Sequence, residues 1–168
     1  MISASYVRMM AAYNRWQNGQ LTECFLSLPD VELRRERGAY FGSILGTANH
    51  LLWGDLMWMS RFDGGDKPAG GITGSEALCA DLVDWQSARK DMDARIVAWA
   101  DGLSDERLAG TLTWFSGAAG HEVTKPLGML VVHMYNHQTH HHGQIHKMLT
   151  EADAKAPVSD LFFMPEDA

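Results

Sequence analysis

The segment from residue 75 to about residue 101 most constrains what this chain can fold into. Its core-type positions recur in alternating steps of four and three residues, with one polar member, at Leu78, Leu82, Trp85, Arg89, Met92, Ile96 and Trp99. Such a seam is typical of a helix that packs lengthwise against other helices in a bundle. Gly102 is placed to end this helix.

Three further segments show helical spacing between recognisable start and stop signals. The first covers residues 3 to 28 and ends at Pro29. The second begins with Ser43 as N-cap and reaches about Phe62. The last begins at Pro126, with Thr124 as a candidate cap, and continues to about residue 150. The sequence therefore predicts an all-α fold, a four-helix bundle.

The stretches between the helices read as connections. DGGDKPAGG, after the second helix, is predicted to be a loop, and residues 110 to 125 are compatible with a short hairpin before the last helix. In the tail, residues 161 to 164 form an apolar run, Leu-Phe-Phe-Met, that we expect to pack on the bundle or on a second subunit. No repeat or boundary divides the chain, so one domain over residues 1 to 168 is expected.

Composition excludes several classes of protein. The 168 residues carry a formal charge of -7 with no cluster of Lys and Arg, which argues against a nucleic-acid partner. No apolar run is long enough for a membrane span, and the N-terminus lacks a signal-peptide pattern. Cys24 and Cys79 are expected to be buried free thiols. These features predict a soluble, cytoplasmic protein without a membrane partner.

Histidines mark the last helix as the place for unusual chemistry. Six of the eight lie between His133 and His146, and residues four apart share a helix face. Several such pairs are available, but the apolar seam of this helix includes only His137 and His141. The remaining four are expected on or beyond the edges of that face: His133, His140, His142 and His146.

Two imidazoles in a bundle core are costly to desolvate unless each finds a partner, and a metal ion is a strong one. Catalytic zinc sites, and comparable nickel or iron sites, use three protein ligands and keep a position open. His50, flanked by apolar residues in the second helix, is the natural third donor, whereas His121 looks exposed. A hydrogen-bonded core histidine is the alternative interpretation of His50.

Several segments resemble the DinB/YfiT-like family. The family pairs an early helix with an NH motif and a later helix with a pattern like NHxTxHRGQ, which here read Asn49-His50 and NHQTHHHGQ at residues 136 to 144. YNRWQN at residues 13 to 18, RGAYFGSILGTANHLLWGD at residues 37 to 55 and the closing PVSDLFF match in the same order. The resemblance therefore covers most of the chain.

The resemblance implies an up-down-down-up four-helix bundle, often a homodimer, with a divalent metal held by His50, His137 and His141. Its relatives include enzymes that act with low-molecular-weight thiols, as transferases or isomerases, and others described only as hydrolases. One departure matters, because the family's common Arg after the last ligand is His142 here. An imidazole cannot replace the bidentate fork of a guanidinium.

Two functions are carried forward. The first is a metal-dependent enzyme in which a divalent ion, zinc or nickel by preference, activates water, a thiol or a small-molecule substrate. The second is a non-catalytic metal-binding, stress-associated protein, because no general acid or base stands near the ligands in sequence. Asn49, Asp55, Asn136 and Gln144 are candidates to orient the imidazoles. The six tryptophans either line a pocket or, as is more usual at helical spacing, fill the core.

Overall fold

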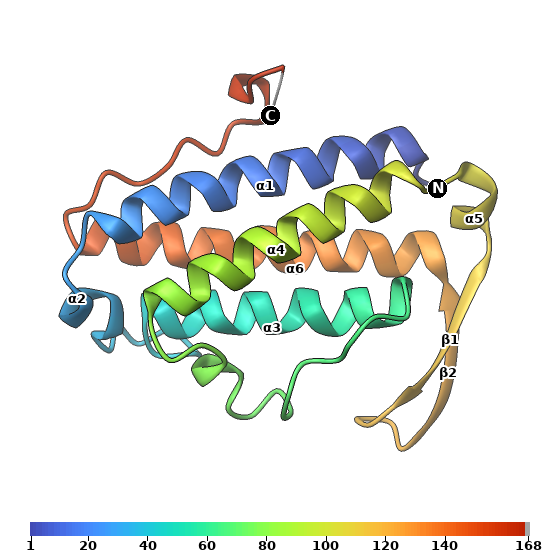
Figure 1. Cartoon of the computed structure of the whole chain (residues 1–168), viewed down its shortest axis with the longest axis horizontal. Coiled ribbons are helices and arrows are strands. Elements are labelled where there is room, and N and C mark those ends of the chain that lie inside the picture. Colours follow the sequence, from blue (N-terminus) through green and yellow to red (C-terminus); the bar gives the residue numbers. More distant parts are fainter. Residues whose placement is uncertain (167–168) are drawn as a thin grey trace.

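A computed structural model describes residues 1 to 166 of the chain (Figure 1). Most of it is helical, as predicted, but a two-stranded sheet makes the term all-α too strict. The labelled elements are, in chain order, α1 (Ala4–Leu26), α2 (Asp30–Arg34), α3 (Ile44–Phe62), α4 (Leu82–Asp101), α5 (Asp105–Ala109), β1 (Thr111–Ser116), β2 (His121–Pro126) and α6 (Leu127–Glu151). Two one-turn 3-10 helices lie at Ser75–Ala77, before α4, and at Leu161–Phe163, after α6.

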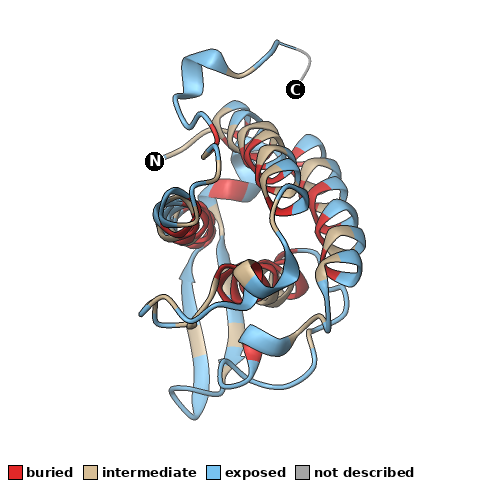
Figure 2. Ribbon diagram, turned by 90° about the vertical axis from the view of Figure 1, so that its left-hand side faces the viewer, coloured by how far each residue is buried: buried red, intermediate tan, exposed pale blue. Residues whose placement is uncertain are grey.

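The four long helices, α1, α3, α4 and α6, enclose one hydrophobic core. Helix α1 packs on α4 and α6, and α3 packs on the same two helices. Figure 1 shows that α1 and α6 run in one direction and α3 and α4 in the other. Seen from the side in Figure 2, the buried residues lie on the faces that the helices turn toward one another. Within the described residues, no helix is long and apolar enough to span a membrane.

Side-chain caps begin three of these helices. Ser3 accepts a hydrogen bond from the Tyr6 backbone N–H at 3.2 Å, and Ser43 accepts one from Gly46 at 3.0 Å, as expected for N-caps. Helix α4 starts later than predicted, because Asp81 caps it and Ser75 belongs to a separate 3-10 turn. The seam over residues 75 to 101 therefore includes Leu78, which lies before the helix.

Two other boundaries differ from the sequence prediction. The first helix ends at Leu26 rather than residue 28, and Pro29 then caps the short helix α2, where no helix was predicted. Thr124 is not a cap, since it lies in β2 and its hydroxyl pairs with that of Thr113 across the hairpin at 2.7 Å. The hairpin itself is present, with antiparallel pairing of β1 and β2, and His121 is exposed on it as expected.

The C-terminal arm returns along α1 after α6 ends. The Tyr13 hydroxyl donates to the Ser159 carbonyl at 2.6 Å, and the Gln17 amide donates to the Val158 carbonyl at 2.8 Å. The apolar run that follows does not pack on the bundle of its own chain, since Phe162 is 79% and Phe163 60% exposed. Figure 1 shows this turn standing away from the helices. Packing on a second subunit stays a prediction.

A buried polar network crosses the core and involves all four long helices. Arg89 donates to Asp55 at 2.6 Å, and its Nη2 lies 2.9 Å from Asp93. Gln138 donates to Asp55 at 2.9 Å, and Asn18 donates to Asp93 at 2.8 Å. Every one of these side chains is buried. Since a buried charge needs a partner, the network fixes how the helices pack on one another.

Candidate metal centre

Helices α3 and α6 lie side by side and bring three histidines together. His50 comes from α3, and His137 and His141 lie one turn apart on α6. The Nε2 atom of His137 is 3.2 Å from Nε2 of His50 and 3.1 Å from Nε2 of His141. One ring nitrogen of each residue falls within 4.8 Å of the others. The geometry therefore unites the three residues that the sequence selected.

Ser75 fixes the protonation of His50. The Nδ1 atom of His50 is 2.8 Å from the Ser75 hydroxyl, and that hydroxyl gives its own proton to the Ile72 carbonyl at 2.7 Å. Ser75 must therefore accept from His50, so Nδ1 carries the proton and Nε2 keeps its lone pair. Ser75 reaches His50 because Gly74, at φ +90°, turns the chain into the 3-10 helix that carries Ser75.

Gln144 does the same for His141. Its side-chain oxygen lies 2.8 Å from Nδ1 of His141, so this nitrogen donates and the lone pair of Nε2 faces the cluster. The Gln144 amide group contacts His140 at 3.2 Å, which holds the oxygen toward His141. Gln144 was a sequence candidate for this role, whereas Ser75 was missed because its partner is distant in the chain and no spacing rule links them.

His137 occupies the centre of the cluster. Its Nδ1 atom is buried without a hydrogen-bond partner in the described part of the chain, and its Nε2 atom faces both other imidazoles. Room for the ring depends on Gly54 of α3, because a Cβ atom there would stand 2.7 Å from Cε1 of His137. Gly54 is therefore a site residue that the sequence gave no reason to single out.

The environment favours neutral imidazoles. Burial, together with repulsion among the histidines, lowers the pKa of His50 to about 4 and that of His137 to about 3. Burial also lowers the pKa of His141. At neutral pH all three rings are therefore uncharged, which is the state that binds a metal ion.

The donor set fits a divalent metal. The lone pairs of His50 and His141 are aimed at His137, because the protons of these two rings lie on Nδ1. Only the single proton of the neutral His137 ring is then available as a donor to the three nitrogens that face one another. Two nitrogens bound to one zinc ion at about 2.0–2.1 Å in tetrahedral geometry are about 3.3 Å apart, close to the separations here. The three-histidine cluster is thus compatible with a divalent ion.

The other candidates have different roles. The Asn49 amide donates to the carbonyls of Glu76 and Cys79, so it holds the segment that carries Ser75 and touches no imidazole. Asp55 belongs to the buried network and Asn136 is exposed. Cys79, like Cys24, is a free thiol as expected, but both are only partly buried.

His142 contradicts the expectation that it lies at the edge of the apolar face. It is only 9% exposed, and its Nε2 atom lies 2.9 Å from the side-chain oxygen of Asn18. The helix face that meets α1 buries it, a face that the seam through His137 did not include. Since the position that is Arg in the family pattern is directed into the core here, it offers no surface for an anion.

Aromatic rings cover the cluster. Phe41 stacks on His50 with ring centroids 3.6 Å apart and planes at 14°, and its edge meets His141 at 5.7 Å. Trp53 stacks on His50 more loosely, at 6.1 Å. Trp85, by contrast, lies in the core against Phe25. Phe41 was not singled out by the sequence, since it lies in a loop before α3.

Fold and site together define a class of helical protein in which two helices hold a buried three-histidine cluster suited to a divalent ion. A family model agrees with this class, because the DinB family matches residues 1 to 167. The chain belongs to the DinB family. The comparison with curated proteins gave no match.

A solved structure supports the fold. A DinB-like protein from Bacillus cereus ATCC 10987 superposes with a TM-score of 0.59, over 84% of this chain and 89% of that one. Its sequence is 17% identical, so the likeness concerns the fold alone.

Proposed function

We propose that this protein is a divalent-metal-dependent enzyme whose ion is held by His50, His137 and His141. One observation carries the proposal: Ser75 and Gln144 set the protonation of two imidazoles so that their lone pairs meet at His137. A structural core histidine needs one partner, and it does not need two neighbours aimed at the same point. Zinc or nickel is the expected ion, since both accept imidazole nitrogen.

The residues of the chain suit a reactive ion better than a purely structural one. Three neutral ligands leave the charge of the ion uncompensated. Among residues 1 to 166, no fourth His, Cys, Asp or Glu joins the three histidines as a ligand. When bound, such an ion acts as a Lewis acid toward water, a thiol or a substrate oxygen. Ser75 and Gln144 hold the imidazoles in place, and Phe41 and Trp53 exclude water from one side. We propose hydrolase or thiol-dependent transferase or isomerase chemistry on a small molecule.

A second candidate, a non-catalytic metal-binding, stress-associated protein, is favoured by the partners of the ligands. These are a hydroxyl and an amide, and within the described residues no carboxylate contacts an imidazole of the cluster to act as general base.

We also propose an up-down-down-up four-helix bundle, supported by the helix directions in Figure 1. A single domain, a homodimer and a cytoplasmic location, the last supported by two free thiols, complete the proposal.

Metal content tests whether the three histidines bind an ion, as both candidate functions require. Tag-free protein should carry about one ion per chain by mass spectrometry, and His50→Ala, His137→Ala and His141→Ala should each lose it. His121→Ala, which removes an exposed hairpin histidine, is the matched control and should keep the ion. Absence of metal from the wild type after reloading with zinc and nickel would reject the proposal.

Turnover is the second measurement. Loaded wild type should process at least one member of a panel of thiol adducts, activated esters and amides faster than His137→Ala does. A full ion content with no difference in turnover across the panel would favour the non-catalytic function.

A further inference from the structure

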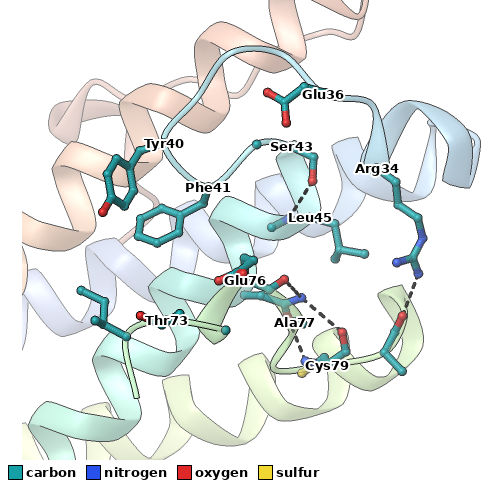
Figure 3. Close-up of a pocket in the computed structure, with 16 residues that line it drawn as sticks. Arg34, Glu36, Tyr40, Phe41, Ser43, Leu45, Thr73, Glu76, Ala77 and Cys79 are labelled. Carbon is teal, nitrogen blue, oxygen red and sulfur yellow. Dashed lines mark hydrogen bonds between the residues drawn. The ribbon is translucent and has the colours of Figure 1, made fainter. Parts of the chain in front are cut away.

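A cavity lies next to the metal centre but does not reach it. It has a volume of about 700 Å³ and is bounded by the loop before α3 and by the segment from Ile72 to Ala80 (Figure 3). Its size falls in the range of small-molecule pockets, roughly 300–1,000 Å³. None of the three histidines of the cluster lines it. The cavity and the proposed ion are therefore separated by protein.

Phe41 is the separating side chain. The residue lines the cavity, where Figure 3 shows its ring beside Tyr40 at one side of the space. The same ring lies flat on His50 and meets the edge of His141. A molecule in the cavity therefore meets Phe41 before it can meet an ion bound to these histidines.

The backbone around Phe41 is held in place, so only the side chain is free to move. The Arg37 N–H donates to the Gly42 carbonyl at 2.8 Å, and the Ser43 N–H donates to the Phe41 carbonyl at 2.9 Å. A Cβ atom at Gly46 would stand 2.3 Å from that carbonyl, so the glycine admits the Phe41 backbone close to α3. Gly42, at φ +74°, adopts a left-handed conformation that favours glycine.

Space for a moving ring exists on one side only. Phe41 is half-buried, with the histidines on one side and the cavity on the other. Rotation about its side-chain bonds would carry the ring from His50 into the open volume without breaking a backbone hydrogen bond. Rotamer changes are rapid for exposed side chains, but this ring must first leave its stack on His50, so its rotation is a slower step that can limit binding.

We propose that the cavity is the substrate chamber of the metal centre and that the Phe41 ring is the gate between them. A small organic molecule enters the chamber first and reaches the ion only when the ring leaves His50. The inference rests on the proposed function, since it requires an ion at the three histidines. It adds a specificity-determining residue, because the ring and its space limit which molecules approach the ion.

The test measures how fast a small probe binds to the ion, rather than enzymatic turnover. Cobalt-loaded protein is mixed with 2-mercaptoethanol or azide, and the visible spectrum of the ion reports binding in stopped flow. In the wild type the observed rate should reach a plateau as the probe concentration rises, because ring rotation becomes limiting. In Phe41→Ala the rate should rise linearly and exceed the wild-type plateau at least tenfold.

Two variants make the result specific. Phe115→Ala removes a ring that is 66% exposed on β1 and does not line the cavity, and it should keep the wild-type plateau. Phe41→Leu retains an apolar side chain if the alanine variant folds poorly, and it should raise the plateau.

Two outcomes would overturn the gate. Identical plateaus in wild type, Phe41→Ala and Phe41→Leu, with cobalt bound normally, would reject it while leaving the metal centre intact. Failure of the wild type to bind cobalt at all would reject both the metal centre and the gate.

Discussion

His141 and His142 are adjacent in sequence and identical in chemistry, yet they belong to two different polar regions of the core. His141 directs the lone pair of Nε2 toward His137, while the Nε2–H of His142 donates to Asn18. The assignment for His142 follows because Asn18 gives its amide proton to Asp93 and so presents its oxygen. The two rings differ in what faces them rather than in how deeply they are buried.

The two regions differ in the balance of donors and acceptors. In the buried network, donors from Arg89, Gln138 and Asn18 converge on the carboxylates of Asp55 and Asp93. Each carboxylate of that set is therefore faced by a cationic and an amide donor from the chain itself. In the histidine cluster, the lone pairs of His50 and His141 converge on His137, which has at most one proton to give to either of them, whereas a cation can bind all three nitrogens. The comparison teaches that convergence of lone pairs, more than burial, distinguishes a ligand site from a structural polar core.

Removing the guanidinium of the buried network should have the largest effect on the free energy of unfolding. Arg89→Met leaves two buried carboxylates without their partner, so the free energy of unfolding should fall by about 3–5 kcal/mol. Arg95→Met is the matched control on the same helix, because Arg95 pairs with Asp63 nearer the surface and should cost at most about 1 kcal/mol. Urea denaturation of the metal-free proteins measures both. Equal losses in the two variants would show that the network is not a structural core.

A single added methyl group tests the histidine cluster, as Arg89→Met tests the buried network. Gly54→Ala places a Cβ atom against the His137 ring, so we expect metal affinity to fall about 10–100-fold, as when an imidazole loses its orientation. The stability of the metal-free protein should fall by about 1–3 kcal/mol from overpacking. Competition with a chromogenic chelator gives the affinity, and urea denaturation gives the stability.

Gly143→Ala is the matched control for this substitution. Gly143 lies on the ligand helix with nothing within 4 Å of the added methyl group, so the affinity should be unchanged. Stability should rise by about 0.5–1 kcal/mol, because alanine favours helix over glycine. Unchanged affinity in Gly54→Ala would mean that His137 does not need its present place to bind the ion.

The sequence predicted the parts of this molecule that depend on local periodicity. The long helices, the cap at Ser43 and the convergence of His50 with His137 and His141 follow from spacing and from family resemblance. Contacts between distant segments could not be predicted in this way. Ser75, Gly54 and Phe41 meet the histidines only because loops and a second helix pack against them. The network joining Arg89 to Asp55 is hidden for the same reason, although one polar residue in an apolar seam hinted at a buried partner.

The smallest effect that we predict is the pH dependence of folding stability caused by His142, which contacts Asn18 of the network. Burial lowers the pKa of His142 to about 3 from 6.5, so between these pH values the unfolded chain binds a proton that the folded chain does not. Folding stability therefore falls as the pH drops below about 6.5. His142→Gln keeps a donor toward Asn18 but cannot titrate, so its stability should fall less steeply.

The difference between wild type and His142→Gln should approach one proton, or about 1.4 kcal/mol per pH unit, between pH 6 and pH 5. Burial raises the pKa of Asp93 to about 6, which opposes the histidine effect, but this carboxyl is present in both proteins and its contribution largely cancels in the difference. Urea denaturation in the presence of a chelator, repeated across this range, supplies the slopes. Parallel slopes would mean that the folded protein accepts a charged His142, so that its burial beside Asn18 would not keep this imidazole neutral.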